Sequence, residues 1–231
     1  MAPFAPSQRA FERTDELRDN ILYYYTIPSP PRCFLLLVDS SGCVWRSELC
    51  DQPPCVAALA QQYPGYHLEA DAIPDEDAHN EEGNGRVARN GIAARHITVR
   101  LLLHYFNCPA LPPNADDSAV ESRNRMLDEL VRAVPLHIPP SMYRYRDTWE
   151  NLRRIPFGRA VSYDEFLRDL GNPDVVGKAL QNNPFVGLLP SHRIVGRHPG
   201  LLGFASQIRD KQWLMQRERR VAQRVTPSQD Y

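Results

Sequence analysis

A serine and a histidine stand side by side directly after a proline, at the end of an apolar stretch. Residues 183–189 form this stretch, Pro190 interrupts it, and Ser191-His192-Arg193 follow before two β-branched residues. Pro190 has no N–H group and a fixed φ, so it ends the buried segment. Ser191 is then the first residue able to present a reactive group, and a hydroxyl beside an imidazole is the pair that nucleophilic catalysis uses.

Two ordinary interpretations compete with this one. An isolated serine–histidine pair is most often two polar surface residues. A serine hydrolase would carry its nucleophile in the turn Gly-x-Ser-x-Gly, and Ser191 has Leu189 and Arg193 where the two glycines would stand. The pair therefore predicts a reaction centre only where further motifs accompany it.

Helical patterns surround the pair. Apolar spacing predicts four helices in the C-terminal part, at 145–155, 164–170, 173–181 and 206–220. Ser162 followed by Glu165 fits a capping box, and Asn172 followed by Pro173 fits an N-cap before the first helical residue. Two short helices joined by a turn that contains glycine form a helix-turn-helix pattern, which many DNA-binding domains use.

The N-terminal half has strand-like patterns instead. Residues 33–38 and 43–49 are predicted to pair as a hairpin, 56–63 and 92–106 to form helices, and the acidic segment 71–91 to form a loop. We therefore expect an α+β fold. A small α/β domain over residues 1–112, with a hairpin or sheet plus helices, precedes a linker with a helix over 113–140. A mostly helical domain with the helix-turn-helix follows over 141–231.

Charge is unevenly distributed although the net charge is −1. Residues 141–231 hold 15 Lys+Arg against 9 Asp+Glu, so the remaining 140 residues hold 12 of the 27 basic and 19 of the 28 acidic residues. A basic half favours a polyanion such as nucleic acid as its partner. No stretch has the apolar core of a signal peptide or the roughly 18 apolar residues of a membrane span. We expect an intracellular protein with no membrane partner, nuclear if eukaryotic and otherwise cytoplasmic.

The five cysteines form no CxxC pair. An odd number of cysteines without a signal peptide predicts reduced thiols. Cys43, Cys50 and Cys55 are close in sequence, but their spacing fits no common zinc finger. We expect no cofactor and no metal, with zinc in the N-terminal domain as the alternative.

Several motifs together resemble the O6-alkylguanine-DNA alkyltransferase family. Those motifs occur in the family's order over about residues 143–218: Trp149-Glu150-Asn151-Leu152, Ile155-Pro156-Phe157-Gly158, Val161-Ser162-Tyr163, Gly171-Asn172-Pro173, Asn183-Pro184, Pro190-Ser191-His192-Arg193-Ile194-Val195, and Lys211-Gln212-Trp213-Leu214 with Glu218. The resemblance implies that the target guanine is flipped out of duplex DNA into a pocket. It also implies transfer of the alkyl group from guanine O6 to a cysteine, and Ser191 occupies that cysteine's position.

The resemblance implies a role for each matched residue. The acceptor site comprises Ser191 as the acceptor position, His192 as the base acting through a water, Glu218 as the holder of the histidine, and Asn183 as the brace of the turn. The substrate base is expected to meet Tyr163, Leu180, Phe204 and the backbone carbonyl of Ile194. DNA is expected to meet Gly177, Lys178, Ala179 and Arg193.

Three residues depart from the family's pattern. Ser191 carries a hydroxyl, which is a far weaker acid than a thiol and a poorer nucleophile, so we expect lesion binding without alkyl transfer. Asp174 stands where the family has an arginine that fills the gap left by the flipped base, and a carboxylate repels phosphate. Phe204 stands where the family has a tyrosine that lines the pocket.

Two explanations of Ser191 stay open. It replaces a native cysteine of a single-turnover methyltransferase, or it is natural and the chain is a non-catalytic lesion-binding protein that recruits other repair factors. Both predict a monomer whose partner is double-stranded DNA carrying O6-alkylguanine. A third interpretation treats the helix-turn-helix as core and the basic half as a protein-binding face.

Overall fold

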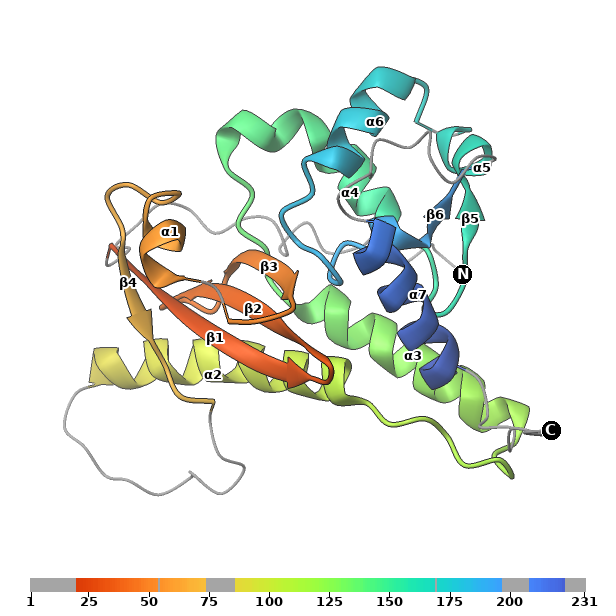
Figure 1. Cartoon of the computed structure of the whole chain (residues 1–231), viewed down its shortest axis with the longest axis horizontal. Helices are drawn as coiled ribbons and strands as arrows, with labels where there is room; N and C mark the ends of the chain where they lie inside the picture. Colours follow the sequence, from red (N-terminus) through yellow and green to blue (C-terminus); the bar gives the residue numbers. More distant parts are fainter. Residues whose placement is uncertain (1–19, 54, 74–85, 169, 197–207, 223–231) are drawn as a thin grey trace. The chain divides into compact units, whose positions relative to one another are not determined.

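The computed structural model describes residues 20–53, 55–73, 86–168, 170–196 and 208–222 of the 231-residue chain. It divides into two compact units, residues 1–106 with 132–138 and residues 107–131 with 139–231. Figure 1 labels the elements of both units. The segment 113–140, predicted as a linker, contains one helix and is shared between the units. Within the described ranges, no helix has the length and apolar character needed to cross a membrane.

The first unit contains a four-stranded sheet. The strands are β1 (Ile21–Ser29), β2 (Arg32–Asp39), β3 (Val44–Cys50) and β4 (His67–Ala70), in the order β3-β2-β1-β4. The β2–β3 hairpin confirms the two strands predicted from the sequence. The interior strand β1 and the short edge strand β4 were not predicted. β1 pairs antiparallel with β2 and parallel with β4, so its place depends on segments distant in sequence.

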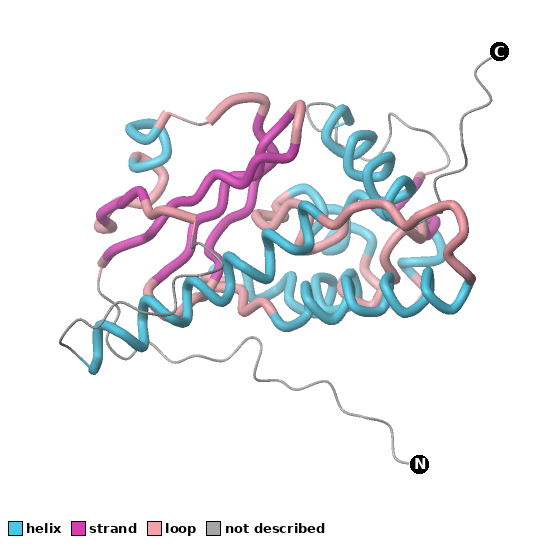
Figure 2. The backbone as a smooth tube through the Cα atoms, turned by 90° about the horizontal axis from the view of Figure 1, so that it is seen from below, coloured by secondary structure: helices cyan, strands magenta, loops and turns pink. Residues whose placement is uncertain are grey.

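Two helices accompany this sheet, α1 (Val56–Ala60) and α2 (Arg86–Asn107). Figures 1 and 2 show α2 lying across one face of the sheet. Phe34 of β2 stacks on Phe106 of α2 with ring centroids 3.7 Å apart, and the Thr98 hydroxyl donates to the carbonyl of Gly42 at 2.8 Å. The helix begins inside the segment 71–91, which the sequence predicted as a loop.

The second unit is mostly helical. Its helices are α3 (Asp117–Ala133, of which residues 132–133 belong to the first unit), α4 (Arg146–Leu152), α5 (Tyr163–Leu167), α6 (Pro173–Gln181) and α7 (Ile208–Ala222). Two 3-10 helices, η2 (Pro140–Tyr145) and η3 (Ser191–Arg193), and two short parallel strands, β5 (Val161–Ser162) and β6 (Ile194–Val195), complete it. A small sheet unit followed by a helical unit confirms the expected α+β class.

Helix α6 is fixed in place by its cap and by a buried tryptophan. Asn172 Oδ1 accepts from the backbone N–H groups of Asp174 and Val175 at 3.1 and 3.3 Å, as the predicted N-cap requires. Trp149 of α4 is fully buried, and its Nε1–H donates to the carbonyl of Ala179 at 2.9 Å. The start of α6 and its inward face are therefore both determined by hydrogen bonds.

Candidate active site

Ser191 lies at the start of η3, at the end of a turn that an asparagine side chain closes by hydrogen bonds. Asn183 Nδ2 donates to the carbonyl of Leu189 at 2.9 Å and to Ser191 Oγ at 3.2 Å. Asn183 Oδ1 accepts from the backbone N–H of Phe185 at 2.9 Å. One amide side chain thus joins the beginning and the end of the turn and meets the hydroxyl group.

The neighbouring histidine is buried and is hydrogen-bonded to a carboxylate of α7. His192 Nε2 lies 2.7 Å from Glu218 Oε1, and the two residues are 4% and 3% exposed. Burial lowers the pKa of His192 below its ordinary value, although Glu218 opposes this shift. His192 is therefore neutral near pH 7. An ionised Glu218 can only accept, so His192 donates through Nε2 and its Nδ1 carries the free lone pair.

Glu218 is shared between the histidine and an arginine. Arg193 Nε and Nη2 each donate to Glu218 at 2.9 Å, and the backbone N–H of Gly158 donates to its Oε2 at 3.2 Å. Burial alone would raise the pKa of Glu218, but His192 and Arg193 together hold it well below the ordinary value. The carboxylate is therefore charged at neutral pH and can orient the imidazole.

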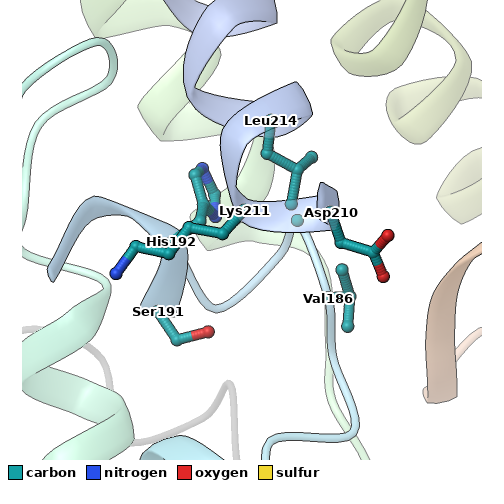
Figure 3. Close-up of a pocket in the computed structure, with 7 residues that line it drawn as sticks. Val186, Ser191, His192, Asp210, Lys211 and Leu214 are labelled. Atoms are coloured by element: carbon teal, nitrogen blue, oxygen red, sulfur yellow. The ribbon is translucent and has the colours of Figure 1, made fainter. Parts of the chain in front are cut away.

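Ser191 and His192 both line a pocket. The hollow contains about 340 Å³ of empty space, part of it open to solvent. Figure 3 shows Ser191 and His192 of η3 opposite Asp210, Lys211 and Leu214 of α7. The arrangement places a hydroxyl at a cavity with an imidazole–carboxylate pair behind it.

Lys211 of α7 reaches the carbonyl that the resemblance assigns to the guanine amine. Its Nζ donates to the carbonyl oxygen of Ile194, and burial lowers the pKa of its ammonium. A carbonyl oxygen has two lone pairs, so it can still accept a second hydrogen bond. Lys211 belongs to the motif Lys211-Gln212-Trp213-Leu214, but the sequence indicated no role for it.

Tyr163 lies where α5 meets the first turn of α6. Its hydroxyl donates to the carbonyl of Pro173 at 3.1 Å and would lie 3.8 Å from a Cβ placed on Gly177. Burial, followed by the charge of Asp174, raises the pKa of the phenol. Asp174 and Lys178 are exposed on α6. Tyr163, Gly177 and Lys178 are thus grouped on and beside one helix.

Three predicted contact residues are buried instead. Ala179 and Leu180 are 0% and 2% exposed, and Arg193 is 4% exposed with its guanidinium bonded to Glu218. The structure places all three side chains in the interior of the second unit, and their contacts with DNA or with the substrate base stay predictions. Val176 shares the inward face of α6 with Ala179 and Leu180, so their helical spacing was a signal of burial. Phe204 lies outside the described residues.

Asp128 of α3 also lies at this site, and nothing in the sequence pointed to it. Its Oδ1 is 3.5 Å from Arg193 Nη1, and its Oδ2 accepts from the backbone N–H of Phe157 at 3.1 Å.

The described part of the chain holds no group of three or more His, Cys, Asp or Glu side chains that could bind a metal ion.

Residues 144–220 match the family model described as the DNA binding domain of 6-O-methylguanine DNA methyltransferase. The methylated-DNA–protein-cysteine methyltransferase of Shigella flexneri is 36% identical over 76 residues, which are 32% of this chain and 44% of that protein. A protein of Thermus thermophilus named DNA base-flipping protein is 42% identical over 71 residues, 30% of this chain and 48% of its own. The chain thus spans less than half the length of these relatives.

The structural comparison covers nearly the whole chain. The crystal structure of Mycobacterium tuberculosis O6-methylguanine methyltransferase superposes with a TM-score of 0.50 at 19% identity, covering 90% of this chain and 96% of that one. At this identity the likeness shows the fold. Together with the family match it confirms the resemblance seen in the motifs. Residues 144–220, which hold the pocket and its Ser191–His192–Glu218 arrangement, are thus similar to the DNA binding domain of the 6-O-methylguanine DNA methyltransferases.

Proposed function

We propose that this chain binds duplex DNA, takes an O6-alkylated guanine into the pocket beside Ser191, and does not receive the alkyl group. The observation that carries the proposal is the presence of Ser191 at a pocket whose wall includes His192, with Glu218 behind it. The imidazole–carboxylate pair is the arrangement expected behind an acceptor group, and the group at the proposed acceptor position is a hydroxyl.

The chemistry of the hydroxyl explains why transfer should fail. Attack on an alkyl carbon needs an anionic nucleophile, and a thiol with a pKa of about 8.5 is ionised far more readily than an alcohol. His192 is a weak base because burial lowers its pKa. Asn183 already donates to Ser191 Oγ at 3.2 Å and occupies one of its lone pairs. The site therefore orients a substrate alkyl group without supplying a competent nucleophile.

Entry of the base requires that it leave the stack, at a cost of a few kcal/mol. We propose that α6 faces the DNA, with Gly177 allowing close approach and Lys178 contacting a phosphate. The cap residue Asn172 and the tyrosine hydroxyl of Tyr163 hold the first turn of that helix. Asp174 is exposed on the same turn and repels phosphate, so we expect modest affinity.

A binding assay with the unmodified chain tests this function. Fluorescence anisotropy with short duplexes that differ only in one O6-methylguanine should show tighter binding to the methylated duplex. Lys178→Gln should weaken binding to both duplexes equally, because a phosphate contact carries no base information. Tyr163→Ala should instead reduce the preference for the lesion. Equal affinity of the unmodified chain for both duplexes would exclude lesion recognition.

The alternative is that the native protein carries cysteine at position 191 and is a methyltransferase. The relatives named methylated-DNA–protein-cysteine methyltransferase favour it, whereas the relative named DNA base-flipping protein accords with a binding role. Ser191→Cys should take label from DNA containing O6-methylguanine, one alkyl group per protein molecule, and adding His192→Gln should slow the transfer. Selective lesion binding combined with no transfer by Ser191→Cys would favour the non-catalytic role, in which other repair factors are recruited.

A further inference from the structure

Helix α3 precedes the residues that match the family domain, yet its Asp128 reaches the buried ion pair behind the pocket. The family match begins at residue 144, and α3 ends at Ala133. Asp128 is partly buried, with its side chain 14% exposed. Arg123, one and a half turns earlier, donates from its guanidinium to the carbonyls of Pro109 and Val221, which ties the same helix to the end of α7.

Two contacts of the Asp128 carboxylate converge on the site. Its Oδ1 faces Arg193 Nη1 at 3.5 Å, and the same nitrogen donates to the carbonyl of Ile155 at 2.5 Å. Its Oδ2 accepts from the backbone N–H of Phe157 at 3.1 Å. Arg193 is therefore held from opposite sides by Glu218 and Asp128. The turn 155–158 contributes backbone groups to all three side chains.

Charge balance shows what this second carboxylate does. Arg193 and Arg217, which are 4% and 5% exposed, are two buried positive charges near His192, and both lower its pKa. Glu218 and Asp128 both contact Arg193, so two carboxylates stand against the charges of the two guanidinium groups. Lys211 on the pocket side adds a further, partly buried positive group. Without Asp128, a proton arriving on His192 would meet one more uncompensated positive charge in a poorly solvated site.

We propose that Asp128 is a positioning residue of the acceptor site. It neutralises the charge of Arg193 from the side opposite Glu218. Glu218 is then able to orient His192 and to stabilise its protonated form. This role rests on the proposed function, because a base beside the acceptor matters only if the pocket takes an alkylated base. Asp128 is not among the residues that line the pocket, and it acts through Arg193.

The test measures the histidine itself, in the unmodified chain and without DNA. The imidazole nitrogens of His192 are followed by NMR across a pH titration, with His192→Gln used to assign the signal among the seven histidines. Asp128→Asn keeps an oxygen that can accept from Phe157 but removes the charge. It should lower the titration midpoint of His192 by about one pH unit. Glu129→Gln, a matched change at an exposed neighbour on α3, should leave the midpoint unchanged.

Asp128→Ser is the second variant. The substitution removes the negative charge, and the serine hydroxyl can still accept a hydrogen bond. Both variants should show the lowered midpoint, and in a Ser191→Cys background both should slow alkyl transfer near neutral pH by roughly tenfold. An unchanged His192 midpoint in a folded Asp128→Asn protein would overturn the proposal. Loss of the folded state in both variants would assign Asp128 to the framework alone and overturn it as well. Because the titration needs no DNA, its result is independent of whether Ser191→Cys transfers an alkyl group.

Discussion

Replacing Glu218 with glutamine should destabilise the second unit strongly. The carboxylate is 3% exposed and accepts from His192, from Arg193 and from the backbone of Gly158. Glutamine has nearly the same shape, but it carries no charge and turns one acceptor into a donor. Arg193 would then remain in the interior without its bidentate partner. Removing one member of a buried ion pair costs about 3–5 kcal/mol, a large part of the ~5–15 kcal/mol that stabilises a typical domain.

The measurement is urea unfolding followed by circular dichroism near neutral pH, with Glu121→Gln on the exposed face of α3 as control. The control should change the free energy of unfolding by no more than about 0.5 kcal/mol. Glu218→Gln should lower the melting temperature by roughly 6–20 °C, at ~2–4 °C for each kcal/mol in a protein of this size. A loss below about 1 kcal/mol would refute the view that this carboxylate holds the buried cluster together.

The pH dependence of the same variant gives an independent check. The pKa of Glu218 lies well below its ordinary value of 4.5 in the folded chain. Its ionised form therefore contributes stability that is fully present above about pH 4.5 and is lost as the pH falls through the lower, folded value. The difference in unfolding free energy between the unmodified protein and Glu218→Gln should narrow below about pH 4.5. A difference that widens with acid would contradict the assignment.

Three further predictions concern a turn, a buried hydrogen bond and the histidine. Gly158 has φ +74°, and a Cβ there would come within 2.4 Å of an α7 side chain, so Gly158→Ala should lower the unfolding free energy by over ~2 kcal/mol. Gly171→Ala, at φ +70° with nothing within 4 Å, should cost only about 1 kcal/mol. Trp149→Phe leaves the Ala179 carbonyl without its donor and should cost about 1–3 kcal/mol by the same urea assay. Burial lowers the pKa of His192, so below about pH 6.5 the unfolded chain binds a proton that the folded chain does not. His192→Gln should therefore reduce the loss of unfolding free energy between about pH 7.5 and 5.5. An equal dependence of the unfolding free energy on pH in the variant and the unmodified protein would contradict this prediction.

Local signals predicted much of the second unit. Ser162 Oγ accepts from the N–H of Glu165 at 3.1 Å, and Asn172 caps α6, as the cap patterns indicated. The β2–β3 hairpin was readable for the same reason, since its turn and both strands are contiguous. Each of these features depends on residues a few positions apart, so their types and spacing carry the information.

The pairing of strands and the packing of helices that lie far apart in the sequence could not be predicted in this way. Strand β1 became an interior strand of its sheet through partners in β2 and in β4, and Ile21 pairs with His67 in register. Helix α2 extends through residues whose composition indicated a loop. Neither outcome follows from local composition, because each depends on which distant surface the segment packs against.

In the candidate site, too, features that depend on neighbouring residues were predictable from the sequence, and features that depend on long-range packing were not. The sequence by itself determined the match of residues 144–220 to the family's DNA binding domain and the motifs that carry Ser191, His192 and Glu218, because these residues belong to ordered motifs. Only the tertiary structure decided that Arg193 is buried and that Asp128 joins the cluster. Burial and ion pairing depend on which helices pack together, and a carboxylate on α3 looks the same in sequence whether it faces solvent or a buried guanidinium.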